Sequence, residues 1–123
     1  MKAANLKTGI RLRIVLQPGV AFGPGKADLL EGIAQTGSIA AAGRRMGMSY
    51  KRAWGLVEVL NSYFREPLVE SSRGGSRGGG AALTETGRRV LELYRGMEER
   101  AVASSRSQVN ELRSMLSDIS SGT

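Results

Sequence analysis

The residues best suited to chemistry are four neighbouring hydrogen-bond donors, Ser49, Tyr50, Lys51 and Arg52. Apolar residues follow them at helical spacing, and serine is a preferred N-cap, so we expect the donors in the first turn of a helix. Lys and Arg side chains can donate to the O6 and N7 acceptors of guanine, although one of the two could contact only phosphate. Taken alone, two basic residues on a helix are more often a solvated face.

A second group of donors, Arg73, Ser76 and Arg77, lies in the glycine-rich segment SRGGSRGGG. The segment lacks the GK[ST] ending of a phosphate-binding loop, and no helix start follows it. Two RGG tripeptides could instead form a single-strand RNA-binding tract. Their position between two strand-like segments favours the tip of a hairpin, where glycines permit close approach to a nucleic-acid backbone and arginines attract phosphates or a narrow minor groove.

Missing residue types narrow the chemistry further. The 123-residue chain has no Cys and no His, which removes disulfides, thiolate nucleophiles and most routes to catalytic triads and zinc sites. We therefore expect no enzyme, no catalytic residue, no metal site and no cofactor. The 18 Lys and Arg against 11 Asp and Glu give a net charge of +7, which favours a polyanionic partner without separating nucleic acid from a membrane surface.

The N-terminal part of the chain is expected to support these groups within a single domain, because the length fits only one. Apolar and other residues alternate over residues 9–16, which predicts one edge strand, and a Pro- and Gly-rich loop follows over residues 17–25. A helix is expected from near Lys26 to residues 36–37, with Leu29, Leu30 and Ile33 facing inward. The sequence has no signal peptide and no run of 18 apolar residues, so a cytoplasmic location without a membrane partner is expected.

The middle of the chain has the pattern of a helix-turn-helix over residues 38–64. Ser38 can cap a short helix over residues 39–46, Gly47 turns the chain, and Ser49 caps a longer helix that ends before Pro67. In this motif the second helix enters the major groove with its N-terminus first, and the backbone N–H groups at both caps can bind phosphate. Trp54 is expected to pack rather than to stack on bases. Two short helices around a glycine also occur in proteins that never bind DNA.

The C-terminal part predicts a hairpin and a helix with an unpartnered face. Short strands are expected over residues 68–70 and 81–83, and Thr84 can cap the helix that follows. Apolar residues on that helix recur at steps of four, three and four, as in a coiled-coil seam that buries itself against a partner helix. These seam residues predict a homodimer: Val90, Tyr94, Met97 and Ala101.

The fold class expected from these elements is mainly α with a small β component, a winged helix-turn-helix with a C-terminal dimerisation helix. Residues 1–103 would form the DNA-binding domain including that helix. Residues 104–123 would form a C-terminal helical extension or tail, because serines interrupt the pattern and a second, shorter apolar face follows.

Three motifs resemble the N-terminal domain of the ModE-type molybdate-responsive transcriptional regulators. They are the GSI helix start, the SYKRAW opening of the second helix, and a GG-GGG wing that leads into LT-x-x-G. The resemblance covers about residues 6–101. It implies a dimeric winged helix-turn-helix that binds a palindromic DNA operator, usually to repress molybdate uptake genes.

Full-length members of that family also carry C-terminal β-barrel domains that bind molybdate or tungstate. The sequence ends before such domains, so the chain is expected to resemble single-domain members, and the resemblance assigns no oxyanion ligand to it. Molybdate binding by this chain is therefore not expected. The alternative function left open is an RNA-binding or protein-interaction module that uses the RGG-like loop on a helical scaffold.

Overall fold

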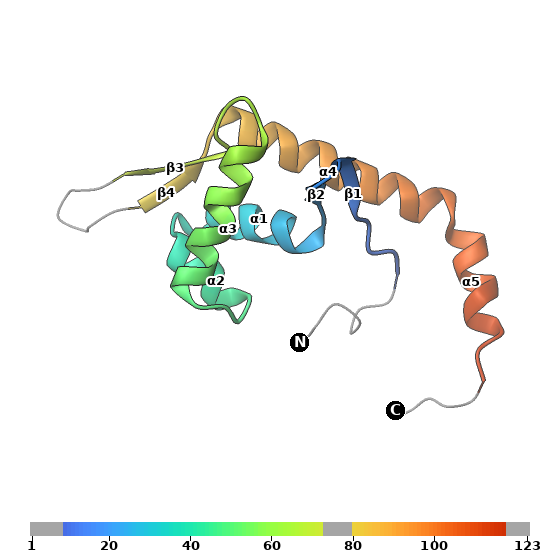
Figure 1. Ribbon diagram of the computed structural model, residues 1–123. Coiled ribbons are helices and arrows are strands. Elements are labelled where there is room, and N and C mark those ends of the chain that lie inside the picture. The colour runs from blue at the N-terminus through green and yellow to red at the C-terminus, as the bar shows by residue number, and fades with distance from the viewer. Residues whose placement is uncertain (1–8, 73–79, 118–123) are drawn as a thin grey trace.

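The computed structural model describes residues 9–72 and 80–117, in which helices predominate and two small antiparallel sheets flank them (Figure 1). Three helices, α1 (Pro24–Thr36), α2 (Ile39–Arg45) and α3 (Tyr50–Tyr63), form the central unit. Strands β3 (Val69–Ser72) and β4 (Gly80–Leu83) form a hairpin that extends from it, and the long helix α4 (Glu85–Ser104) crosses the unit before α5 (Arg106–Ser114). The expected fold class is confirmed.

The N-terminal segment differs from the expected single edge strand. Strand β1 (Ile14–Gln17) pairs with β2 (Val20–Phe22), which lies in the segment predicted to be a loop. The turn between them is possible because Gly19 adopts a positive φ of 84°. Phe22 at the end of β2 is buried, so the hairpin returns an aromatic ring to the core.

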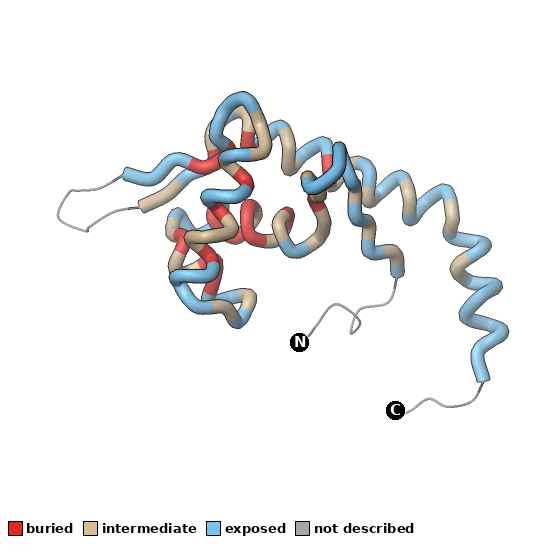
Figure 2. The backbone as a smooth tube through the Cα atoms, viewed as in Figure 1, coloured by how far each residue is buried: buried red, intermediate tan, exposed pale blue. Residues whose placement is uncertain are grey.

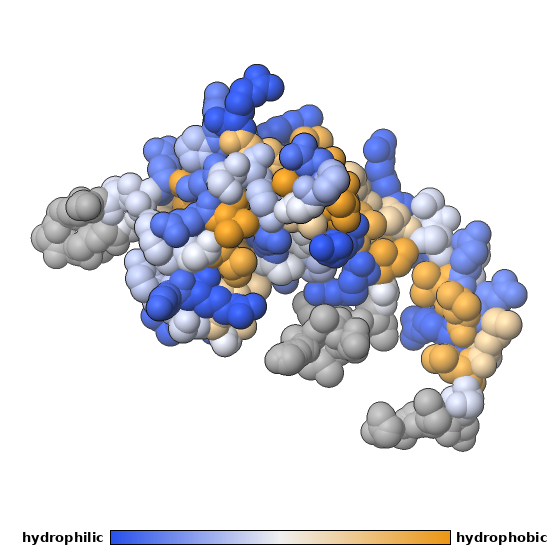
Figure 3. Space-filling view, viewed as in Figure 1, coloured by the Kyte–Doolittle hydropathy of each residue, from blue (hydrophilic) through white to orange (hydrophobic). Residues whose placement is uncertain are grey.

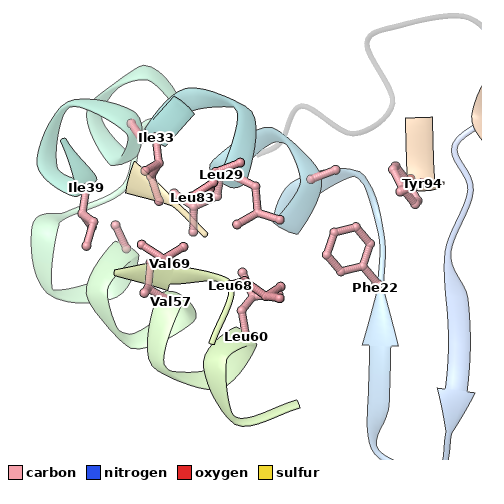
Figure 4. Close-up of a cluster of buried hydrophobic side chains, with 14 residues drawn as sticks. Phe22, Leu29, Ile33, Ile39, Val57, Leu60, Leu68, Val69, Leu83 and Tyr94 are labelled. Carbon is pink, nitrogen blue, oxygen red and sulfur yellow. The ribbon is translucent and has the colours of Figure 1, made fainter. Parts of the chain in front are cut away.

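The core lies between the three central helices and the β3–β4 hairpin. Leu29, Leu30 and Ile33 of α1 are fully buried, as predicted, and the hairpin adds Val69 and Leu83 to the same cluster (Figure 4). Two glycines let α2 lie close to its neighbours. A Cβ at position 32 would lie 2.9 Å from the Cβ of Ala42, and one at position 43 would lie 2.8 Å from the Cβ of Ala53. These contacts hold α2 tightly between α1 and α3.

Helix α4 is attached to the N-terminal segment and to α1 near its middle, through Tyr94 and Arg95. The Tyr94 ring packs edge-on against Phe22 at 5.1 Å, and its hydroxyl donates to the carbonyl oxygen of Leu12 at 2.6 Å. The guanidinium of the next residue, Arg95, donates to Asp28 and Glu31 of α1 and to Glu98 of α4. The rest of α4 and all of α5 lie away from the core and are mostly exposed (Figure 2).

The boundary between α4 and α5 falls at Ser105, within the serine-rich stretch that was expected to weaken the helix. None of the residues of α5 is buried. Leu112 in α5 and Met115 and Leu116 directly after it are exposed apolar side chains. Over the described ranges, no helix has the length and apolarity needed to span a membrane.

Candidate nucleic-acid interface

The turn between α2 and α3 is set by local hydrogen bonds. The Ser38 hydroxyl accepts from the backbone N–H of Ala41 at 3.0 Å, and the Ser49 hydroxyl accepts from that of Arg52 at 3.1 Å. Both serines are therefore the N-caps that the sequence predicts. Gly47 lies between the helices with φ at 73°, a left-handed conformation that favours glycine. The expected helix-turn-helix geometry is confirmed.

The first turn of α3 presents the predicted donors to the surface. Ala53, Val57 and Leu60 are buried on the inner side of the helix, which leaves the opposite side outward. Lys51 and Arg52 are exposed, and Tyr50 keeps 58% of its surface accessible. The structure therefore brings Ser49, Tyr50, Lys51 and Arg52 together at one exposed helix end.

The aromatic ring of Trp54 lies one turn after Tyr50. The two rings are nearly parallel, with centroids 6.4 Å apart and an interplanar angle of 12°. Trp54 is partly buried and packs against the core cluster, as the sequence predicts. It therefore supports Tyr50 from the inside and holds the tyrosine near the helix N-terminus.

The start of α2 is less open than the start of α3. Ser38 is half-buried, and its backbone N–H donates to the hydroxyl of Thr36 at 3.1 Å. This N–H, predicted to bind phosphate, already has a partner within the chain. At the other end of α2, Arg44 is exposed, and Arg45 donates to the Gln35 side chain at 2.7 Å. The sequence reasoning left these two arginines out of the site, although the run GRRMG places basic residues directly before the turn.

The β3–β4 hairpin, which we call the wing, is bonded to α3 through one side chain that the sequence reasoning missed. The Asn61 side-chain oxygen accepts from the backbone N–H groups of Leu68 at 2.8 Å and Val69 at 3.0 Å, and its amide donates to the Val69 carbonyl at 3.1 Å. A second contact joins the wing to the α1–α2 turn, where the N–H of Ala81 donates to the Gly37 carbonyl at 2.9 Å. The base of the wing is therefore fixed relative to α3.

The strands of the wing are in regular register, from the pair Val69 and Leu83 to the pair Ser72 and Gly80. The expected hairpin is confirmed. Arg73, Ser76 and Arg77, the predicted contacts at its tip, lie outside the described residues.

The proposed dimer seam on α4 needs a correction. Tyr94 is 1% exposed and occupied by contacts within its own chain, so the prediction that it faces a partner is wrong. Val90, Met97 and Ala101 do reach the surface, and Leu93, which the periodicity argument passed over, is 48% exposed beside them. The open apolar face of α4 therefore contains Leu93 in place of Tyr94, beside the other predicted residues. Figure 3 shows further apolar side chains gathered on α5 at the right of the molecule.

Comparison with known proteins identifies the family. The family described as bacterial regulatory helix-turn-helix proteins of the LysR type matches residues 26–88, which include most of α1, all of α2 and α3, the wing and the start of α4. The chain belongs to this LysR-type helix-turn-helix family.

Curated relatives of this LysR-type chain include ModE regulators and molybdenum-pterin-binding proteins, and the resemblance to ModE-type regulators is confirmed. The transcriptional regulator ModE of Haemophilus influenzae is 42% identical over 87 residues, which are 71% of this chain and 34% of that protein. The molybdenum-pterin-binding protein MopB of Rhodobacter capsulatus is 39% identical over 85 residues, 69% of this chain and 32% of that protein. The chain thus spans about a third of the length of these relatives.

Solved structures similar to this LysR-type chain include DNA-binding domains. The CbnR DNA-binding domain in complex with DNA is 26% identical with a TM-score of 0.55, and the match covers 71% of this chain and 95% of that domain. Lactococcus lactis ZitR, at 20% identity and a TM-score of 0.56, covers 88% of this chain and 73% of its own, and it supports the fold alone.

Proposed function

We propose that this chain is a sequence-specific DNA-binding transcriptional regulator of the ModE type. One observation carries the proposal: the exposed donors at the start of α3 and the base of the wing are held in one fixed arrangement by Asn61. A recognition helix for the major groove and a wing for the adjacent backbone need this fixed arrangement, because each positions the other on the duplex. The family match and the DNA complex of the CbnR domain support the same function.

The recognition helix would read bases through Tyr50, Lys51 and Arg52. Arginine or lysine donating to guanine discriminates against other bases by roughly 1 to 3 kcal/mol per good pair. Ser49 lies at the exposed start of α3 and would position the protein against a phosphate, whereas the N–H of Ser38 already donates to Thr36. The wing arginines, Arg73 and Arg77, with Ser76 between them, would add contacts to the backbone or the minor groove.

The similarity to a ModE transcriptional regulator and to a molybdenum-pterin-binding protein supports a regulon linked to molybdenum. Repression would be the mode of action. The molecule would act by binding and not by catalysis, and a chromosomal target places it in the cytoplasm. It would bind as a homodimer, with residues 1–103 as the DNA-binding unit and residues 104–123 as a helical extension. Two-fold symmetry would set the recognition helices about 34 Å apart, or a multiple of that distance, on a palindromic operator.

The test replaces Lys51 and Arg52 together with Ala and measures binding to a selected operator and to a scrambled duplex. The double variant is expected to lose its preference for the operator and to keep its fold, because both side chains are exposed. A matched control replaces Arg106 and Arg113 of α5 with Ala, which removes the same charge far from α3. Unchanged discrimination in the α3 variant contradicts the proposal, as does preferential binding of single-stranded RNA in competition at fixed salt.

A further inference from the structure

The outward face of α3 continues beyond the predicted donors. Lys51, Gly55 and Glu58 follow one another at steps of four and three residues, and therefore share one side of the helix. The residues opposite them, Ala53, Val57 and Leu60, are buried. This outward face, which we call the reading face, thus begins with a cation and ends two turns later with an anion.

Gly55 leaves the middle of the reading face open. A Cβ at this position would meet no atom of residues 9–72 and 80–117 within 4 Å, so packing among these residues does not account for a glycine here. Glycine is a weak helix former, and alanine at this position would stabilise the helix more. The absence of a side chain does allow the backbone of α3 to come close to another molecule. A close approach brings the side chains on either side of Gly55 nearer to that molecule.

Glu58 is exposed at the far end of this open stretch. Its carboxylate takes part in none of the ion pairs formed among residues 9–72 and 80–117. An unpaired anion on the surface that faces DNA is repelled by phosphates unless it meets a hydrogen-bond donor. An ionised carboxylate can only accept, which limits the groups it can recognise.

The length of the reading face fits a major groove. Seven residues separate Lys51 from Glu58, which corresponds to about 10 Å along a helix. That distance spans about three base pairs, and recognition helices contact bases with residues spread over two turns.

We infer that Glu58 is a specificity-determining residue that accepts a hydrogen bond from the N4 amino group of a cytosine, about three base pairs from the contact of Lys51. The inference rests on the proposed DNA-binding function. Cytosine fits better than adenine, the other base with an amino group in the major groove, because adenine presents its N7 acceptor beside the donor and N7 repels a carboxylate. Cytosine presents the donor alone.

The experiment selects bound duplexes from a random pool with four full-length proteins: the natural chain and its E58Q, E58A and E99Q variants. Glu99 is an exposed glutamate on α4, far from α3, and its variant makes the same charge change outside the reading face. Binding is then measured for the selected site and for the same site with the assigned C·G pair changed to T·A, over a range of salt.

The natural chain and E99Q are expected to prefer C·G at one position by about tenfold. E58A, which has no acceptor, is expected to lose that preference at this position alone. E58Q is expected to weaken it, because the neutral amide oxygen still accepts while its NH2 group can donate to the N7 of adenine. The preferences at the other positions and the slope of affinity against salt are expected to stay unchanged. Two results overturn the inference: an unaltered base preference in both Glu58 variants, or tighter binding of all duplexes alike, which would mean simple repulsion from phosphates. If the natural chain selects no sequence, both the proposed function and the inference that rests on it are wrong.

Discussion

Replacing Gly87 with Ala tests how closely α4 lies against the loop before the wing. A Cβ at this position would lie 2.1 Å from the carbonyl oxygen of Leu68 and 2.9 Å from its carbonyl carbon. That carbonyl oxygen accepts from the N–H of Thr84 at 2.9 Å, and the N–H of Leu68 donates to Asn61. Neither side can move without losing a hydrogen bond. The collision is therefore with fixed backbone and not with a side chain that can rotate.

The expected cost follows from these distances. Overpacking of this kind typically costs about 1 to 3 kcal/mol. Loss of the bond between Thr84 and Leu68 adds about 1 kcal/mol. The better helix propensity of Ala offsets about 1 kcal/mol of this loss in the free energy of unfolding. We expect Gly87→Ala to lower the free energy of unfolding by about 2 kcal/mol, which corresponds to a fall in Tm of roughly 8 °C.

Gly96 provides the matched control, because it lies in the same helix and a Cβ there would meet no atom of the described part of the chain within 4 Å. Gly96→Ala should raise the free energy of unfolding by up to about 1 kcal/mol through helix propensity alone. Thermal and urea unfolding followed by circular dichroism, at one protein concentration, measures both variants. Shifts of the same sign and size at the two positions would refute the claim that close packing at Gly87 sets the path of α4.

Three further predictions concern other contacts. Asn61→Ala should lower the free energy of unfolding by about 2 kcal/mol, measured by urea unfolding, because it leaves the buried N–H groups of Leu68 and Val69 without an acceptor. Desolvation by burial, reinforced by Glu98, raises the pKa of Tyr94 from 10.0 to about 12. The contribution of Tyr94 to the free energy of unfolding should therefore be fully present below pH 10 and be lost as the pH rises through 12, and Tyr94→Phe should reduce this loss in unfolding experiments at a series of pH values. Leu93→Glu should shift the protein from dimer to monomer in sedimentation at micromolar concentration while its circular dichroism spectrum is kept, whereas a monomeric natural chain would contradict the proposed seam.

The sequence predicted the helix-turn-helix well because its signals are local. The caps at Ser38 and Ser49 and the turn at Gly47 act within a few residues, and the stripe of apolar residues on α3 has one clear direction. The donors at the start of α3 could be predicted for the same reason. A cap followed by an apolar stripe defines both where a helix begins and which side faces outward.

Features that depend on distant partners were missed or misplaced. Strand β2 has only three residues, too few for a periodic pattern, and it is recognisable only from its pairing with β1. Tyr94 fitted a dimer seam because its spacing along the helix indicates that the side chain is buried. The spacing does not reveal whether a partner chain or its own chain buries it. Here Phe22 and Leu12 of its own chain contact it. Asn61 is polar and helical, and its role depends on backbone groups of a later strand.

If the chain binds DNA as proposed, the ion pairs of Arg95 would affect the spacing of its operators. One guanidinium holds two carboxylates of α1, at 2.9 Å for Asp28 and 2.6 Å for Glu31, and so fixes the angle at which α4 leaves the DNA-binding unit. Nine residues of α4 follow Arg95, a length of about 14 Å. A change of about 15° in that angle would displace the far end of α4 by about 3.5 Å, as much as the 3.4 Å rise of one base pair. In a dimer joined through α4, this small cluster of charges would therefore determine the distance between the two half-sites of the operator.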